Sequence, residues 1–290
     1  SSAASDVYKR QHQGQYHERS LYRSGRRQHH QDNRAGGGIK MSNVELAAAM
    51  TMGSLFDGIG GFPLAAIHNG IVPVWASEIE AFPIEVTRLR FPDMVHVGDI
   101  TKLDGAELPP VDIICGGSPC QDLSVAGNRA GLSGARSGLF MEQVRLVKEM
   151  RNAERLRNRT ALDIRPRFMV WENVPGAFSS GTPKGEDFRI VLEEIVRIKV
   201  GGVSVPRPDT GRWESAGRIL LGDTFSLAWR VFDTQYWPGT PQRRRRIYLV
   251  VDFGGETAPK ILFDQESLCR DYSAGIRTGK ASAGAAADFP

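Results

Sequence analysis

The sequence predicts an α/β fold: a Rossmann-like, doubly wound and mostly parallel sheet. Three observations support this fold class. Apolar runs of strand length alternate with helical patterns from Thr51 onward. A glycine-rich turn, DGIGG, directly follows the first of these runs, as it does in nucleotide-binding α/β folds. The 290 residues and a 41% hydrophobic content are enough for one large domain with a substantial core.

Residues 51–157 predict two strand–helix units followed by a longer third one. TMGSLF predicts a strand, and FPLAAIHNG predicts a helix that ends at Gly70. VPVWAS predicts the second strand, and AFPIEVTRLRF a helix in which Pro83 fits only within the first turn. A short apolar stretch precedes Asp99, VDIICGG predicts a buried strand, and the long amphipathic pattern at 139–157 predicts a helix.

The second half repeats the alternation less regularly. RFMVWENV predicts a strand and EDFRIVLEEIVRIK a helix. FSLAWRVFD and RIYLVVDF predict two more strands. After Phe263 the pattern fades into small residues, so 266–290 is interpreted as a linker.

The basic character of the chain belongs to its first forty residues. The formal net charge is +4, but 1–40 carry eight Lys or Arg and three acids, so 41–290 carry a net charge of −1. This segment lacks apolar periodicity, which predicts a disordered basic extension, 1–40. Two interpretations remain: an artefact that precedes a natural start at Met41, or an arm that binds nucleic acid.

The cysteines and histidines exclude several function classes. Cys115, Cys120 and Cys269 have no paired spacing, which argues against disulfides and against zinc or another metal. No apolar run approaches the ~20 residues of a membrane span. We therefore expect a cytoplasmic protein without a metal or a membrane. Only His68 and His96 lie outside the first forty residues, and neither lies in the loops below, so a Cys–His or Ser–His–Asp hydrolase is disfavoured.

The turn FDGIGGF and the acids that follow it suggest a nucleotide-type site. Glu78 stands twenty residues after Gly58, at the end of the next strand, where an acid meets ribose hydroxyls. Pro63 replaces the third glycine of a dinucleotide fingerprint, so a cofactor with adenosine and no pyrophosphate fits better. Asp99 could accept from an adenine amino group. The alternative is a tight turn with an ordinary exposed glutamate.

Three further stretches place chemistry at the same expected sheet edge. GGSPCQDLSVAG carries Cys120 in a turn after a strand, whereas Cys115 lies within the strand and is predicted to be a core residue. WENVPG ends a strand with Glu172, a costly position for a carboxylate without a task. QRRRRIYLV enters a strand, so Arg244 and Arg246 share one face and Arg243 and Arg245 the other.

In this order, FDGIGGF, GGSPCQ, WENVP and QRRRRIYLV closely resemble the motifs of the DNA cytosine-5 methyltransferases of bacteria and phages. The resemblance covers roughly residues 51–265. It implies the fold of the S-adenosylmethionine-dependent methyltransferases, with 41–265 as the catalytic domain and S-adenosylmethionine as the cofactor. The residues that it implies for cofactor binding are Phe56, Gly58, Ile59, Gly60, Gly61, Glu78, Ile79, Asp99, Ile100, Pro119 and Leu139.

The resemblance also implies a reaction on a cytosine flipped out of the duplex. Cys120 would attack C6 as a thiolate, and Glu172 would protonate or hydrogen-bond N3 and the exocyclic amine. Arg246 would hold the O2 carbonyl, and Arg244 would support the loop. C5 would then take the methyl group and lose its proton to water. The residues implied for substrate binding are Gln121, Ser124, Asn173 and Gln242.

The expected partner is double-stranded DNA, read by a monomer that could have a cognate restriction endonuclease. The family's target-recognition region and last cofactor motif are not visible after Phe263. The sequence is thus expected to hold a catalytic half with an incomplete DNA clamp. An RNA cytosine-5 methyltransferase remains possible on this pattern, as does a fragment that binds the cofactor without methylating DNA.

Overall fold

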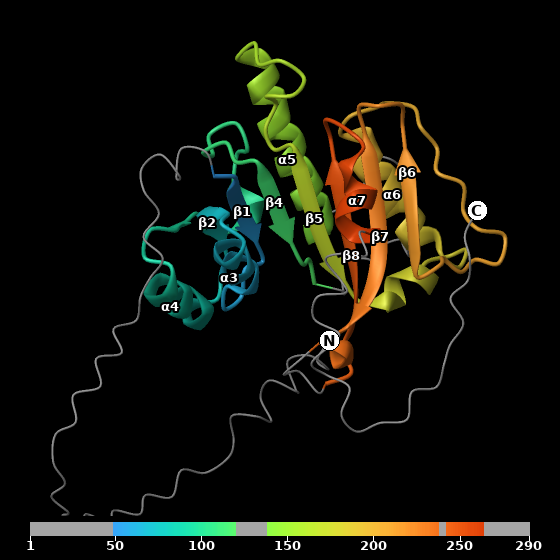
Figure 1. Ribbon diagram of the computed structural model, residues 1–290, viewed down its shortest axis with the longest axis horizontal. Coiled ribbons are helices and arrows are strands. Elements are labelled where there is room, and N and C mark those ends of the chain that lie inside the picture. The colour runs from blue at the N-terminus through green and yellow to red at the C-terminus, as the bar shows by residue number, and fades with distance from the viewer. Residues whose placement is uncertain (1–48, 120–137, 238–241, 264–290) are drawn as a thin grey trace, which may run out of the picture. The chain divides into compact units, whose positions relative to one another are not determined.

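One eight-stranded sheet organises the part of the chain that the structure describes. This computed structural model describes residues 49–119, 138–237 and 242–263, which lie within the second of two compact units, Ser42–Pro290. The strand order is β3-β2-β1-β4-β5-β8-β7-β6 (Figure 1). The chain starts near the centre with β1, moves out to β3, and returns through β4 on the other side of β1, which confirms the doubly wound arrangement.

The strands fall into a parallel part and an antiparallel part. Neighbours among β1 to β5 pair in parallel, whereas β5–β8, β8–β7 and β7–β6 pair in antiparallel fashion. Six strands therefore run in one direction, and β6 and β8 oppose them. The bounds are β1 Thr51–Leu55, β2 Val72–Ser77, β3 Val95–His96, β4 Ile113–Gly116, β5 Phe168–Asn173, β6 Ala216–Leu220, β7 Ser226–Asp233 and β8 Arg245–Asp252.

Helices cover both faces of the sheet. Packing of buried side chains places α3, α4 and α7 on one face and α5 and α6 on the other. In Figure 1 α7 lies in front of β7 and β8, and α6 behind them. The bounds are α3 Gly61–His68, α4 Ala81–Arg90, α5 Leu139–Leu156, α6 Glu186–Arg197 and α7 Thr257–Phe263, with 3₁₀ turns η1 Ile100–Lys102, η3 Pro175–Ser179 and η4 Thr234–Tyr236.

The main core lies between the sheet and helices α5 and α6. Its centre is aromatic: Phe188 of α6 is fully buried and stacks on Trp171 of β5 with ring centroids 6.4 Å apart. Trp229 of β7 meets the same ring edge-on at 5.5 Å. Such rings bury large apolar areas and favour these geometries. The cluster thereby fixes β5, which carries a candidate catalytic residue at its end.

Among the strands and α-helices of the described ranges, β6 and α7 were not predicted from the sequence. β6 is a short edge strand in which exposed and half-buried residues alternate. Its Gly217 lies against the Trp229 ring and has no side chain of its own. The sequence of β6 therefore lacks the apolar run that predicts a buried strand. α7 begins at Thr257, whose backbone N and Oγ1 donate to the Asp252 carboxylate. Its Ala258 and Leu262 cover the face of β7 and β8. The last strands are also antiparallel: β7 and β8 are joined by residues 234–244, a connection shorter than the dozen or more residues that a parallel crossover needs.

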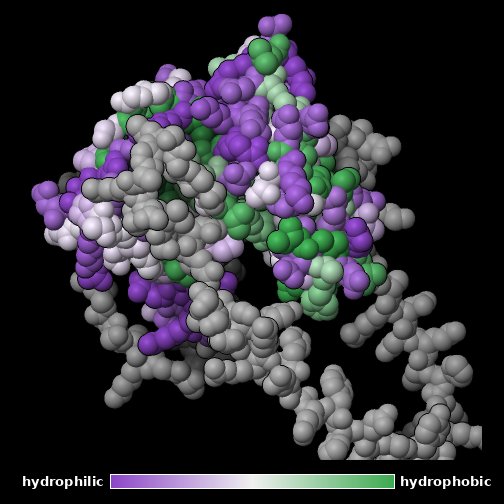
Figure 2. Space-filling view, turned by 180° about the vertical axis from the view of Figure 1, so that it is seen from behind, coloured by the Kyte–Doolittle hydropathy of each residue, from purple (hydrophilic) through white to green (hydrophobic). Residues whose placement is uncertain are grey.

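The surface in Figure 2 mixes hydrophilic and hydrophobic side chains, with the apolar ones in separate patches. Across the described ranges, the structure contains no helix that is both long enough and apolar enough to cross a membrane.

Candidate active site

The predicted site residues converge on one edge of the sheet. The glycine turn follows β1, Glu78 follows β2 and Asp99 follows β3. Gly117 follows β4, and Glu172 is the fifth residue of the six in β5. β8 runs in the opposite direction, so its beginning, not its end, lies at this edge. Ligands in open α/β sheets bind at this edge, outside the carboxyl ends of the parallel strands.

The turn after β1 needs its glycines. Gly58 and Gly60 have φ angles of 55° and 85°, in the left-handed region that glycine adopts without strain. Phe56 shares this conformation, with a φ of 54°. A Cβ on Gly60 would lie 2.4 Å from the Phe91 ring, so this position also needs glycine for close packing against α4. A Cβ on Gly58 or Gly61 would meet no atom within 4 Å, so the turn borders open space.

Glu78 is bound to this turn by its carboxylate. Its Oε2 accepts from Gly58 N at 2.8 Å, and its Oε1 accepts from Ile79 N at 2.7 Å and Glu80 N at 3.0 Å. A carboxylate offers about four acceptor positions, so it can still accept from a hydroxyl group. The twenty-residue spacing seen in the sequence therefore corresponds to a direct contact.

Asp99 lies beside the same strand ends. Ser77 Oγ donates to Gly98 O at 2.7 Å, which joins the end of β2 to the loop that carries Asp99. Asp99 Oδ1 accepts from Thr101 N at 3.0 Å, and this hydrogen bond lowers the pKa of the carboxyl group. Asp99 is thus an anionic acceptor at the surface.

The other predicted cofactor residues differ in exposure. Ile79 is 68% exposed and Ile59 is 55% exposed, which is unusual for isoleucine and leaves both available to an apolar ligand surface. Pro119 is exposed, and Leu139 is half-buried against the main core. Ile100 is only 3% exposed and packs in that core, so its side chain offers little free surface. Acceptor carboxylates, exposed apolar side chains and open space at the glycines together fit an adenosine-containing ligand.

Asp57 is a buried acid within the glycine turn that the sequence interpretation missed. It is 6% exposed, Ser54 Oγ donates to its Oδ1, and its Oδ2 has no hydrogen-bond partner in the described part of the chain. Burial raises the pKa of Asp57 to about 6. Burial, with the charge of Asp57, raises the pKa of Cys115 to about 12. Cys115 is thus an inert core residue, as predicted.

Glu172 and the arginines before β8 form the polar centre of the other half of the site. Arg246 Nε lies 2.8 Å from Glu172 Oε1, and Arg244 Nη2 lies 3.8 Å from the same oxygen. Both arginines thus reach one side of the sheet, as strand alternation predicts. A Cβ on Gly117 would lie 3.0 Å from Glu172 Oε2. The carboxylate therefore lies directly against the segment that leads to Cys120.

Hydrogen bonds from two side chains of β5 hold the segment after β4. Trp171 Nε1 donates to Ser118 Oγ at 3.1 Å, and Asn173 Nδ2 donates to Ser118 O at 3.2 Å. Asn173 is 1% exposed, so its side chain supports the loop from the interior. Gln242 is exposed, and its backbone O accepts from Thr234 Oγ1. Cys120, Gln121 and Ser124 lie outside the described residues, as do 1–40 and 266–290.

Tyr248 is a further residue of this centre that the motifs did not reveal. It pairs directly with Glu172 across β5 and β8. Burial raises the pKa of its phenol, and the Glu172 charge adds to the rise. The sequence does indicate this position: the alternation that puts Arg244 and Arg246 on one face of the strand also puts Tyr248, two residues later, on that face.

No group of three or more His, Cys, Asp or Glu suited to a metal ion occurs among the residues that the structure describes.

Residues 50–198 match the family model described as C-5 cytosine-specific DNA methylase.

The chain is also similar to named methyltransferases and to a protein of known structure. The DNA N-6-adenine-methyltransferase of Escherichia phage P1 is 31% identical over 242 residues, which cover 76% of this chain and 31% of that protein. The type II methyltransferase M1.ScrFI of Lactococcus lactis subsp. cremoris is 36% identical over 204 residues, covering 70% and 41%. A putative DNA modification methyltransferase from an E. coli prophage has a TM-score of 0.45 at 22% identity, covering 71% and 47%. The chain thus spans less than half the length of each.

Proposed function

This chain belongs to the C-5 cytosine-specific DNA methylase family, and on that premise we propose that it methylates C5 of cytosine in double-stranded DNA. The methyl donor of the family is S-adenosylmethionine. The proposal includes a flipped-out target base, a covalent adduct with Cys120, and a bacterial or phage-infected cytoplasm as the setting. A monomeric enzyme and a cognate restriction endonuclease remain part of the same proposal.

The residues at the first three strand ends fit the proposed cofactor. Glu78 would accept from the ribose hydroxyls while it keeps its hydrogen bond to Gly58 N. Asp99 would accept from the adenine amino group, and the exposed Ile79 would cover the ring. When bound, S-adenosylmethionine supplies an electrophilic methyl group.

One observation carries the proposal: Arg246 and Glu172 meet at 2.8 Å, beside Gly117 and the loop toward Cys120. A cytosine ring presents a carbonyl, a ring nitrogen and an amine along one edge. A guanidinium next to a carboxylate matches that order of groups, since the first donates and the second accepts. Hydrogen bonding at this edge makes C6 electrophilic, which is what a nucleophilic thiolate requires.

The proposed steps use the chain's own side chains. The Cys120 thiolate forms a bond to C6, and the ring electrons move to C5 while Glu172 and Arg246 hold the polarised edge. C5 would then form its bond to the methyl group while the bond from that carbon to the sulfonium sulfur of the donor breaks, leaving its electron pair on a neutral thioether. Water takes the C5 proton, and the electron pair of that C–H bond restores the 5,6 double bond and expels the Cys120 thiolate. Thiol, proton and electron pairs therefore balance over the cycle.

A second candidate function is N6 methylation of adenine, because one relative carries that name. An exocyclic amine can attack a methyl donor directly and needs no thiol adduct. The Glu172–Arg246 pair lies against Gly117, three residues before Cys120 in the sequence, and favours cytosine for this reason. Cytosine-5 methylation of RNA is a third candidate, and cofactor binding without methylation of any nucleic acid is a fourth.

The decisive experiment incubates the full chain with duplex DNA and methyl-labelled S-adenosylmethionine, digests the DNA, and separates the labelled nucleosides. 5-Methyl-deoxycytidine supports the proposal. Labelled N6-methyl-deoxyadenosine would replace it with the second candidate, and label only in a transfer RNA substrate would replace it with the RNA enzyme. Cofactor binding by calorimetry without any transfer would support the fourth candidate.

The covalent step has its own test. Cys120→Ser should abolish cytosine methylation, whereas Cys115→Ala, a change in the core, should retain it. A duplex with 5-fluorocytosine offers no C5 proton to remove, so the adduct should persist and appear by mass spectrometry on Cys120. Full activity of Cys120→Ser would overturn the mechanism and leave the cofactor assignment intact.

A further inference from the structure

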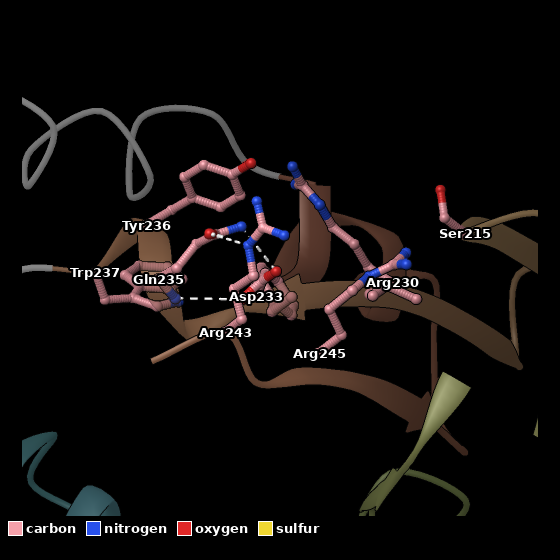
Figure 3. A pocket seen from close by; sticks show the side chains of 10 residues that line it. Ser215, Arg230, Asp233, Gln235, Tyr236, Trp237, Arg243 and Arg245 are labelled. Carbon is pink, nitrogen blue, oxygen red and sulfur yellow. Dashed lines mark hydrogen bonds between the residues drawn. The ribbon is translucent and has the colours of Figure 1, made fainter. Parts of the chain in front are cut away.

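The four consecutive arginines before and within β8 divide between two sites. Arg244 and Arg246 reach Glu172. Arg243 and Arg245 instead line a cavity of about 860 Å³, together with Arg230 of β7. In Figure 3 these three side chains reach into a common space beside Tyr236. The proposed reaction uses only the first pair, so the second pair calls for a separate explanation.

The cavity forms where β7 extends beyond its edge neighbour. The β6–β7 ladder begins with Ala216 opposite Arg230, and Val231 N donates to Ser215 O just before it. From Phe232 onward β7 has β8 on one side and, within the described ranges, no strand on the other. Side chains from both faces of the sheet can therefore line the same space.

Among the described residues that line the cavity, the positive charges of the arginines outnumber the negative charges that could neutralise them. Asp233, the one acid among the described residues that line it, accepts from Gln235 N, Gln235 Nε2 and Arg244 N. Arg243 Nε donates to Gln235 Oε1, a neutral group, at 3.0 Å. No ion pair of Arg230, Arg243 or Arg245 occurs among the described residues. Planar guanidinium groups placed in this way suit an anion such as a phosphate, which they bind with two parallel hydrogen bonds.

Aromatic side chains add a second recognition element. Tyr236 is 64% exposed at the cavity, and Trp237 packs beside Phe232 with ring centroids 6.1 Å apart. An exposed ring next to several arginines is the combination with which proteins hold single nucleic-acid strands, because bases stack on the ring and phosphates pair with the cations. A free inorganic anion would make no use of the ring.

The cavity is also close enough to the reaction centre to hold the same strand. Arg243 and Arg246 are three residues apart, about 10 Å along a β-strand. We propose that the cavity binds the phosphodiester backbone of the DNA strand that carries the target cytosine, with Tyr236 against a neighbouring unstacked base. Flipping a base out of the duplex exposes such neighbours. This inference rests on the proposed function for the identity of the strand.

The test measures binding of the full chain to a fluorescent single-stranded oligodeoxynucleotide and to a duplex over a range of salt concentrations. The test variant is Arg243→Gln with Arg245→Gln. The matched control is Arg155→Gln with Arg218→Gln, which removes two exposed arginines elsewhere. The test variant should weaken binding about tenfold and lower the salt slope by about 0.7 per lost contact on single strands, or 0.9 on duplex. The control should change neither.

Tyr236→Leu separates stacking from charge. It should weaken single-strand binding while the salt slope stays unchanged. An unchanged slope in the double arginine variant would overturn the proposal. So would inorganic phosphate or a mononucleotide that binds as tightly as the oligonucleotide, or an effect on RNA alone. A methyl-transfer assay on the same samples separates a failure of this inference from a failure of the proposed function. A changed salt slope without methyl transfer supports the cavity and contradicts the proposed function. Methyl transfer with an unchanged salt slope supports the proposed function and contradicts the cavity.

Discussion

The carboxylate of Glu172 and the guanidinium of Arg246 meet across two antiparallel strands, with Arg246 Nε 2.8 Å from Glu172 Oε1. They are not directly opposite residues, since Glu172 pairs with Tyr248 and Arg246 with Phe232. The contact is a diagonal one on a single face, within reach of a long side chain. The strand register therefore fixes the position of both groups relative to each other.

Glu172→Gln should reduce methyl transfer about 10²-fold or more, because the neutral amide has neither a proton to transfer to N3 of the base nor a charge to polarise the ring beside Arg246. Cofactor affinity should stay unchanged, since Glu172 lies at the other half of the site. The measurement pairs a labelled-methyl assay with calorimetry. Glu107→Gln, an exposed glutamate elsewhere, is the control. Full transfer by Glu172→Gln would contradict the assignment.

Glu78→Gln should weaken S-adenosylmethionine binding about 10- to 100-fold, the range for losing a hydrogen bond to a charged group. In the parent chain one carboxylate oxygen accepts from Gly58 N, and the other accepts from Ile79 N and Glu80 N. The NH₂ group of a glutamine would therefore face a backbone N–H group in either orientation of the amide. Calorimetry with the cofactor measures the change. Glu80→Gln alters the adjacent exposed carboxylate and should have little effect. Equal affinities in both variants would count against Glu78.

Gly60→Ala and Gly70→Ala form a matched pair. Both glycines have positive φ angles, so each substitution should cost about 1 kcal/mol of conformational strain. Only at Gly60 would the new Cβ also meet a ring, that of Phe91, at 2.4 Å, which should cost about 1–3 kcal/mol more. Urea unfolding of the two variants should show this difference. Equal free energies of unfolding would contradict the packing argument.

Asp57 should make stability depend on pH. Its pKa is about 6 in the folded chain against 3.8 for the unperturbed group, so between these values the folded state binds more protons than the unfolded state. Stability then falls as pH rises from about 4 to about 6, by about 2–3 kcal/mol. Asp57→Asn removes this penalty. The gain in melting temperature over the parent should be near zero at pH 4 and full above pH 6; a gain independent of pH would contradict the prediction.

The sequence predicted the central strands well because their apolar runs are long and bounded by glycine turns. It also predicted that Gly58 and Glu78 belong to one site, since strand order fixes where residues after β1 and β2 meet. β6 was missed because an edge strand with an exposed face has a weak pattern. Asp57 and Tyr248 were missed because their roles come from burial and from a neighbouring strand, and neither property is local in sequence.

The antiparallel β8 has a consequence for the order in which the molecule matures during synthesis. The hydrogen bond from Gly58 to Glu78 joins residues only 20 apart, so the cofactor half can form early from a short piece of chain. The Glu172–Arg246 contact must wait until β8 has been made and has paired with β5. A growing chain folds from its N-terminus, so cofactor recognition would precede the ability to hold a base. Under the proposed function, the pair that holds the base would thus assemble last, when β8, the last strand of the described ranges, enters the sheet between β5 and β7.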